Sequence, residues 1–280
     1  EQIDPSVARW IQEPIGFEAR KVSETGEEQE VEERDLLRQW APVVFVYLLW
    51  ISVFTTSQML LTNTVEEKSN RIIEVLLSSV SPIQLLAGKI GGIAATGLTI
   101  VSSWMLMFFF GTKYLPALLD APASLDLTAM ATDPFYVGSF IAYFLLGYLF
   151  YSAILVALGS VCNTLKEAQN LMGPVTLFLI LPLLAMVPIG QDPNGALAQA
   201  LSYFPPFTPF VMMNRAAGPP STFEYVATTI LLVAAIWAVL WMGAKIFRIG
   251  ILLTGKPPKL REILRWLRAP VGTVAVRKEA

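Results

Sequence analysis

The stretch TVEEKSNRIIEVLLSSVSP, residues 64–82, is a charged amphipathic segment that lies between two long apolar runs. Thr64 followed three residues later by Glu67 matches a capping box, in which each side chain satisfies a free amide at the start of a helix. Apolar residues then recur every three or four positions, and charged residues share the opposite face. We therefore predict a helix over residues 64–81, outside the bilayer, in which Glu67 and Arg71 form a pair one turn apart.

This helix is expected to carry a docking surface. A polar link between antiparallel membrane helices needs only a few residues. A longer capped helix with one apolar stripe is therefore expected to pack on the lipid interface or on a partner protein. The alternative is a solvated connector that packs on nothing.

The composition of the chain places it in a membrane. Of its 280 residues, 54% are hydrophobic and only 15% are charged, which is too apolar for an ordinary soluble domain. The single cysteine, Cys162, excludes an internal disulfide, and the absence of histidine removes the commonest general base and the commonest zinc ligand. We predict no catalytic residue, no metal site and no nucleic-acid partner.

Five stretches are long and apolar enough to cross a hydrocarbon core of about 30 Å as helices. Their backbone groups can be satisfied only within each segment, which forces a helical conformation. The expected fold class is therefore an all-α membrane protein, a polytopic bundle with five transmembrane helices. The predicted spans are residues 41–61, 85–110, 135–161, 171–190 and 223–247.

The distribution of lysine and arginine predicts the orientation of these spans. One side receives helix 64–81, the loop 162–170 and the basic tail 248–280, together with Lys89 and Lys245 at the bases of their spans. That side then holds 13 basic residues, against 7 on the other. We expect it to be the cytoplasmic side of a protein in the cell membrane.

Residues 1–40 are then outside the cell. They hold 11 acidic and 5 basic residues and no long apolar run, and residues 17–22 are compatible with a strand. We interpret this region as the C-terminal end of an extracytoplasmic domain followed by an acidic linker, with the transmembrane domain over 41–247. An odd number of spans with an outside start requires an upstream membrane helix, so the chain, which begins at Glu1, is expected to be a fragment.

The apolar segment 196–218 is interrupted by Pro205, Pro206 and Pro209. Each proline removes an amide donor and stops a helix, so the segment is not expected to span. We predict a short re-entrant or interfacial hairpin on the outer side, with its irregular backbone covered by protein. The alternative is a surface loop with ordinary turn prolines.

Several polar side chains inside the first two spans are candidates for a substrate path. The alternative use of such groups is hydrogen bonding between helices or to a backbone carbonyl one turn earlier. Ionisable residues deep in the spans are nearly absent, which argues against an ion-coupled secondary transporter. The candidate path residues are Ser52, Thr55, Thr56 and Gln58 in the first span, and Thr99, Ser102 and Ser103 in the second.

Residues 250–256, GILLTGK, match the first seven positions of a phosphate-binding loop. Pro257 stands where the magnesium-binding serine or threonine belongs, and the segment follows a membrane helix rather than a strand. We therefore expect this chain to hold no nucleotide and no other cofactor.

Two longer stretches resemble a known family. The run VEEKSNRIIEVLLSSVSPIQLLAGKIGG, residues 65–92, and the ending FRIGILLTGKPPKLREILRWLR, residues 247–268, resemble ABC-2 type permeases of the sodium-export branch, which have the fold of type V exporters. The resemblance implies six spans, with a large extracytoplasmic domain between the first two. It also implies a permease dimer and a separate ATP-binding subunit that holds the ATP and magnesium.

In that family the loop after the second span is the coupling helix, which contacts the ATP-binding subunit. The resemblance assigns this role to a set of charged and apolar residues in the segment quoted first. They are Glu66, Glu67, Lys68, Arg71, Glu74, Leu76 and Leu77.

The resulting hypothesis is a permease subunit that exports its substrate by alternating access, driven by the separate ATPase. A membrane scaffold or sensor without transport is an alternative. An intramembrane enzyme is less favoured, because paired carboxylates or an activated nucleophile are not visible in the spans. Sodium, drug-like, peptide and lipid-like substrates all remain open.

Overall fold

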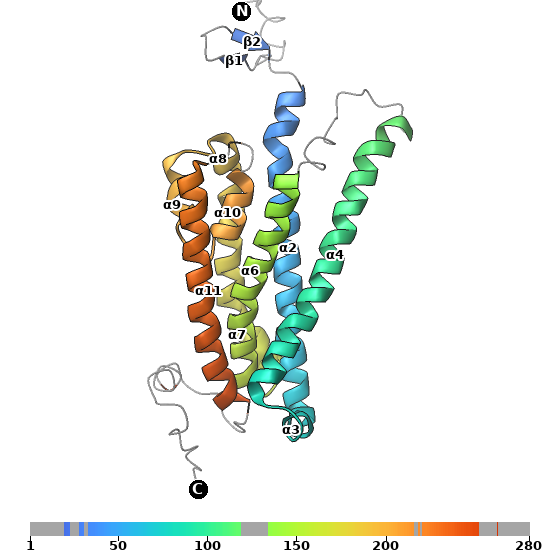
Figure 1. Ribbon diagram of the computed structural model, residues 1–280, viewed down its shortest axis with the longest axis vertical. Helices are drawn as coiled ribbons and strands as arrows, with labels where there is room; N and C mark the ends of the chain where they lie inside the picture. The colour runs from blue at the N-terminus through green and yellow to red at the C-terminus, as the bar shows by residue number, and fades with distance from the viewer. Residues whose placement is uncertain are drawn as a thin grey trace, which may run out of the picture.

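The computed structural model describes residues 20–22, 28–30, 33–118, 134–215, 218, 220–251 and 262. Within these residues the chain is helical except for two short antiparallel strands, β1 (Arg20–Val22) and β2 (Glu28–Glu30), in which Lys21 is opposite Gln29. β1 lies inside the segment expected to form a strand. The rest of the described chain is an elongated bundle of helices (Figure 1).

Among the residues that the structure describes, five helical segments are long and apolar enough to cross a membrane, which confirms the predicted fold class. The helices extend beyond the predicted spans, most of all where α2 continues as far as Ser69, α4 as far as Leu118, and α7 begins at Leu165. The long helices are α2 (Glu33–Ser69), α4 (Pro82–Leu118), α6 (Pro134–Val161), α7 (Leu165–Leu184), which is continued by α8 (Met186–Gln191), and α11 (Thr222–Gly250).

The centre of the bundle is α6, which lies between α2 and α11 (Figure 1). Its sequence is apolar on all sides, and such a helix is stable only when it is surrounded. In the most hydrophobic window of α6, 61% of residues are buried, compared with 17% for α4. The core is therefore built around α6, and α4 is a peripheral helix with one open face.

Glycines allow the central helices to approach closely. A Cβ at Gly243 of α11 would lie 2.9 Å from the carbonyl oxygen of Ala153 in α6, and a Cβ at Gly159 of α6 would lie 3.0 Å from Cδ1 of Leu61 in α2. Helices in membranes associate chiefly through such close van der Waals packing. These contacts join α2, α6 and α11 into one tightly packed group.

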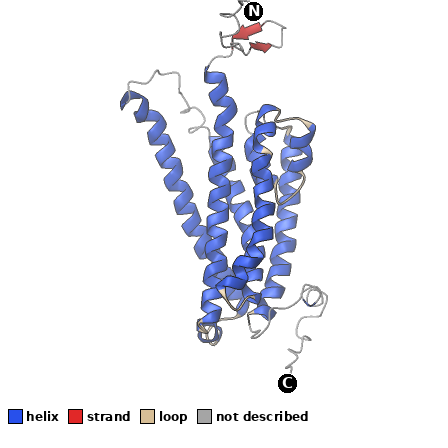
Figure 2. Cartoon of the chain, turned by 180° about the vertical axis from the view of Figure 1, so that it is seen from behind, coloured by secondary structure: helices blue, strands red, loops and turns tan. Residues whose placement is uncertain are grey.

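The two ends of the bundle carry different short helices (Figures 1 and 2). At one end, α3 (Ile72–Leu77) connects α2 to α4, at the end of the bundle where α11 also finishes (Figure 1). At the opposite end, α8 leads into a helical hairpin of α9 (Ala196–Ser202) and α10 (Thr208–Asn214). The segment that connects α2 to α4, predicted to be cytoplasmic, and the predicted outer hairpin therefore lie at opposite ends, and most of the basic tail lies outside the described residues.

The predicted helix start at Thr64 is wrong. Thr64 lies inside α2, where its hydroxyl donates a hydrogen bond of 2.7 Å to the carbonyl oxygen of Leu60. The amides that a capping box would satisfy are already bonded within the continuous helix, so there is nothing to cap. The chain turns only at Arg71, whose φ of 57° is left-handed, and the helix that follows is shorter than predicted.

Ser81 begins a helix, although we expected it to end one. The Ser81 amide donates to Oε1 of Gln84 at 2.9 Å, and the Gln84 amide donates to Oγ of Ser81 at 3.3 Å. Pro82 occupies the first position of α4, where its missing amide costs nothing. This reciprocal pair is a complete capping box.

Most of the predicted loop 162–170 is also helical. Oγ1 of Thr164 accepts a hydrogen bond of 3.2 Å from the Glu167 amide, and Oε2 of Glu167 accepts one of 2.8 Å from the Asn163 amide. These contacts start α7 at Leu165. The helix then continues through Pro174 and breaks at Ala185, three residues after Pro182.

Candidate functional site

The candidate site is the elbow, which we define as residues 66–89: the last turn of α2, α3 and the first turns of α4. Ile73 anchors α3 to the bundle, with 2% of its side chain exposed. On the outward side, Ile72 is 47% exposed and Val75 is 71% exposed. The elbow therefore presents apolar side chains to its surroundings at the very end of the bundle.

The residues assigned to coupling fall into three groups. Glu66, Arg71 and Glu74 are exposed. The partly exposed ones are Glu67, Leu76 and Leu77, and Lys68 is buried. The group does not form a single exposed face, because the residues before Ser69 belong to a spanning helix rather than to a separate amphipathic one.

Glu67 does not pair with Arg71 as predicted. Its carboxylate forms an ion pair with the ammonium group of Lys89 in α4. The helix ends at Ser69, so Arg71 no longer follows Glu67 by one regular turn. The ion pair joins the two arms of the elbow on either side of α3.

Lys68 has a role that the sequence did not reveal. Its Nζ donates hydrogen bonds of 2.6 Å to the carbonyl oxygen of Ser160 and 2.7 Å to that of Gly250. These carbonyls belong to the last turns of α6 and α11, respectively. The only sequence signal was a lysine in the last turn of a long helix, which does not specify its acceptors.

Cys162 lies beside this junction and is fully buried. Burial raises the pKa of its thiol to about 11, and the Glu167 carboxylate acts in the same direction. A thiol with a raised pKa is a poor nucleophile. Its Sγ donates to the carbonyl oxygen of Leu158 at 3.2 Å.

The candidate path residues do not form one group. Ser52 and Thr56 are buried in the core and donate to the carbonyl oxygens of Leu48 and Ser52, respectively. Exposed positions on α2 and α4 hold Thr55, Thr99, Ser102 and Ser103, and Gln58 is partly exposed.

The hydroxyl groups of Thr99 and Ser103 on α4 donate to the carbonyls of Ala95 and Thr99 at 3.0 and 2.8 Å. The backbone-bonding alternative therefore describes these two side chains as well as Ser52 and Thr56. Of the predicted path, only the α4 residues Thr99, Ser102 and Ser103 lie together on one exposed face.

Two of the three hairpin prolines lie between α9 and α10, and the third lies in the first turn of α10. Pro205 and Pro206 lie in the turn, where the Tyr151 hydroxyl donates to the carbonyl oxygen of Pro206 at 2.6 Å. Pro209 lies in the first turn of α10 and packs close to Gly147 of α6. The segment therefore forms a hairpin too short to span, packed against the core.

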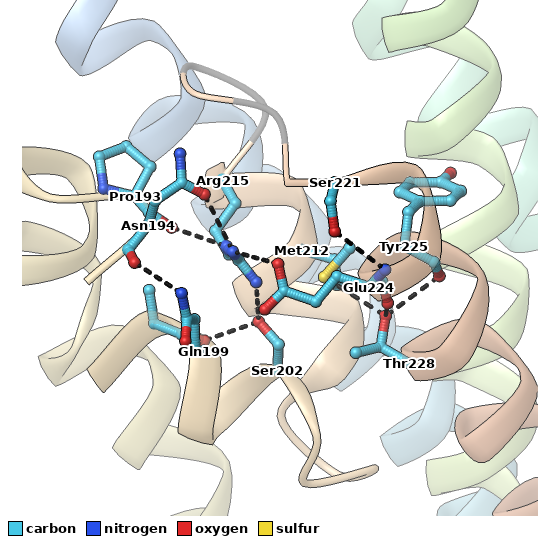
Figure 3. A network of polar contacts seen from close by, with 11 residues as sticks. Pro193, Asn194, Gln199, Ser202, Met212, Arg215, Ser221, Glu224, Tyr225 and Thr228 are labelled. Atoms are coloured by element: carbon cyan, nitrogen blue, oxygen red, sulfur yellow. Dashed lines mark hydrogen bonds and ion pairs between the residues drawn. The ribbon is translucent and has the colours of Figure 1, made fainter. Parts of the chain in front are cut away.

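A buried arginine fixes this hairpin, and sequence reasoning missed it. Arg215, at the end of α10, is 0% exposed. Figure 3 shows its guanidinium group among acceptors from three segments. Nε donates to the carbonyl oxygen of Pro193 at 2.6 Å, Nη1 donates to Oγ of Ser202 at 2.9 Å, and Nη2 donates to Oδ1 of Asn194 and Oε2 of Glu224, both at 3.0 Å. The cluster joins the turn before α9, α9 itself and the start of α11.

In the described part of the chain, the bundle of five candidate spans carries a helical elbow at one end and a helical hairpin at the other. Residues 17–245 match the model of the ABC-2 family transporter protein, so the chain belongs to this family. This family is described as one of transporter proteins.

Two curated relatives are similar to this chain. Uncharacterized protein MJ1024 of Methanocaldococcus jannaschii is 31% identical over 266 residues, which cover 94% of this chain and 62% of the relative. Uncharacterized protein YhaP of Bacillus subtilis is 29% identical over 233 residues, which cover 80% of this chain and 54% of the relative. The chain thus spans little more than half the length of the relatives it matches, and no solved structure matches it.

Proposed function

We propose that this chain is the permease subunit of an ATP-driven exporter and that a separate ATP-binding subunit docks on its elbow. ATP and magnesium belong to that partner. Membership of the ABC-2 family supports an exporter. The sequence supports a separate ATPase, because its phosphate-loop match ends at Pro257.

The exposed apolar surface of α3 carries this proposal. Ile72 and Val75, with Ile83 at the start of α4, are exposed side chains on a connection between two candidate spans. Burying one such side chain in an interface is worth about 1.5 to 3 kcal/mol. The buried Ile73 and the Glu67–Lys89 ion pair hold this surface on the bundle, as a docking element that receives force requires.

We further propose that two permease subunits work as a dimer by alternating access, and that the elbow end faces the cytoplasm. The peripheral position of α4 supports a second subunit, because its most hydrophobic window is only 17% buried. Residues 1–40 are then outside. Sodium, the substrate suggested by the resemblance, is to be tested beside drug-like, peptide and lipid-like compounds, since the charged residues of the spans lie near their ends.

Orientation is tested by labelling single cysteines in intact cells. Gln199→Cys in α9 is expected to react with an impermeant thiol reagent from outside, and Ser69→Cys at the end of α2 only after the cells are opened. The buried Cys162 should give little background. The opposite pattern would reverse the proposed orientation.

The docking proposal is tested by placing a charge on the exposed face of α3. Val75→Asp should leave membrane insertion intact and abolish co-purification with the ATP-binding subunit, because a carboxylate replaces an apolar contact. Leu197→Asp, an equally drastic change at an exposed residue of α9 at the opposite end of the bundle, is the matched control and should retain the partner. Retention of the ATPase by Val75→Asp would reject α3 as the docking element. Recovery of the parent chain without any ATPase would favour a scaffold.

A further inference from the structure

Lys68 contacts the ends of two helices other than its own. The last carbonyl groups of a helix have no partner within the helix and carry its negative dipole end. The Lys68 ammonium group satisfies one such carbonyl in α6, at Ser160, and one in α11, at Gly250. A single cation therefore joins the end of α2 to the ends of α6 and α11.

The neighbouring residue extends this junction to a fourth helix. Glu67 forms its ion pair with Lys89, so two consecutive residues of α2 connect the elbow to α4 on one side and to α6 and α11 on the other. The remaining spanning helix, α7, contacts neither side chain through the hydrogen bonds and ion pairs described above. The last turn of α2 is thus the point at which four of the five long helices are joined.

Close packing around the junction leaves little freedom for independent movement. A Cβ at Gly250 would lie 2.7 Å from Oγ of Ser160 and 2.8 Å from Cγ1 of Val161. The end of α11 therefore rests directly on the end of α6. A shift of the Lys68 ammonium group must either move both ends with it or leave a buried cation without acceptors, which is costly.

We propose that Lys68 is a positioning residue that transmits a displacement of α3 to α6 and α11 during the transport cycle. The inference rests on the proposed function, because the partner ATPase supplies the displacement. α3 follows α2 after only a two-residue turn at Asn70 and Arg71. A displacement of α3 therefore reaches the last turn of α2 first, and the hydrogen bonds of Lys68 transmit it to α6 and α11.

The experiment uses the full protein in complex with its ATP-binding subunit in lipid vesicles. Pairs of spin labels report the distance from α9 to the elbow (Leu197→Cys with Ser79→Cys) and from α9 to the end of α11 (Leu197→Cys with Arg248→Cys). All three labelled positions are exposed. Distances are measured by pulsed electron paramagnetic resonance with and without a non-hydrolysable ATP analogue. Both distances are expected to change in the parent protein.

Lys68→Met removes the cation and keeps most of the aliphatic stem. We expect the nucleotide-dependent change at the elbow to persist and the change at the end of α11 to be lost, together with substrate stimulation of ATP hydrolysis. Lys68→Arg, which keeps the charge and the donors, should recover the α11 change. Lys166→Met removes the same charge from an exposed residue at the same end of the bundle and should behave like the parent.

Lys68→Gln is a second neutral variant in case Lys68→Met does not insert, and the same loss is expected. A parent-like change at α11 in either neutral variant would overturn the proposal. So would failure of both variants to insert while Lys166→Met inserts, because Lys68 would then serve folding alone. No nucleotide-dependent change at either position in the parent would instead reject the proposed function, and the inference with it.

Discussion

Arg215 and Lys68 are both buried cations, and they lie at opposite ends of the bundle. Arg215 is 0% exposed and donates to four acceptors, one of which is the carboxylate of Glu224. Lys68 is 9% exposed and donates to two neutral main-chain carbonyls. Each end of the protein therefore holds a buried positive charge, but a carboxylate helps to stabilise it at the hairpin end, whereas neutral carbonyls do so at the elbow.

The difference indicates how each end behaves mechanically. A guanidinium group is planar, and its donors point in fixed directions, so four acceptors from separate segments lock their relative orientation. An ammonium group on a flexible stem is a point charge that can follow its acceptors through small movements. From this contrast we expect the hairpin end to stay fixed and the elbow end to move as a joined unit.

The largest effect is expected from Arg215→Met. The variant leaves the Glu224 carboxylate, 14% exposed, without its cation, and breaking a buried pair in this way costs about 3 to 5 kcal/mol. The measurement is unfolding of the purified chain in detergent, with Arg248→Met, at an exposed position, as control. Adding Glu224→Gln should restore part of the lost stability. If Arg215→Met instead unfolds like the Arg248→Met control, the cluster adds no stability.

A smaller loss of stability is expected from Lys68→Met. It leaves two neutral carbonyls at helix ends with fewer hydrogen bonds, and the Glu167 carboxylate loses the attraction of a nearby cation rather than a direct ion-pair partner, so the loss should be about 1 to 3 kcal/mol. Comparing its unfolding with that of Arg215→Met under identical conditions tests the contrast directly. An equal or larger loss for Lys68→Met would contradict the view that the elbow end is the less rigidly fixed one.

The sequence predicted the spans because length and apolarity are local properties. The polar junctions could not be predicted in the same way, because they join distant residues: Lys68 and Gly250 are 182 positions apart. The resemblance assigned Lys68 to the coupling helix, and nothing in the sequence around it indicates that two helix ends lie nearby. Arg215 stood in an apolar segment, and a charge there was a signal that we did not use.

The capping-box motif predicts a helix start correctly at one position of this chain and wrongly at another. Thr64 and Glu67 have the same spacing as Thr164 and Glu167, but only Thr164 caps a helix. Thr164 follows the end of α6 at Val161, so its helix starts anew. Thr64 follows an uninterrupted apolar helix, in which propagation is easier than starting again. The motif predicts a helix start only where something has ended the preceding helix.

The two threonines are therefore expected to respond differently to Thr→Val, which keeps the shape and removes the hydroxyl. Thr164→Val loses the cap and should cost about 1 kcal/mol. Thr64→Val loses only a bond to a carbonyl that the helix already satisfies, so its cost should stay below about 0.5 kcal/mol. Detergent unfolding of both variants measures the difference, and equal losses would argue against the cap at Thr164.

The smallest effect concerns Cys162, beside the Lys68 junction. Because burial raises the pKa of its thiol from 9.0 to about 11, the folded protein keeps the thiol proton over a pH range in which the unfolded chain releases it. The stability contribution of this thiol is therefore fully present below pH 9 and decreases as the pH rises from about 9 to 11. Cys162→Ser should flatten this part of the curve of unfolding free energy against pH.

The same thiol should also react slowly with a membrane-permeant maleimide at pH 8. Its modification should be far slower than that of an exposed cysteine at residue 69, placed in a Cys162→Ser background. Both the low thiolate fraction and the burial of Cys162 oppose the reaction. Equal rates would mean that the end of α6 opens readily, which would also remove the tight packing on which transmission through Lys68 depends.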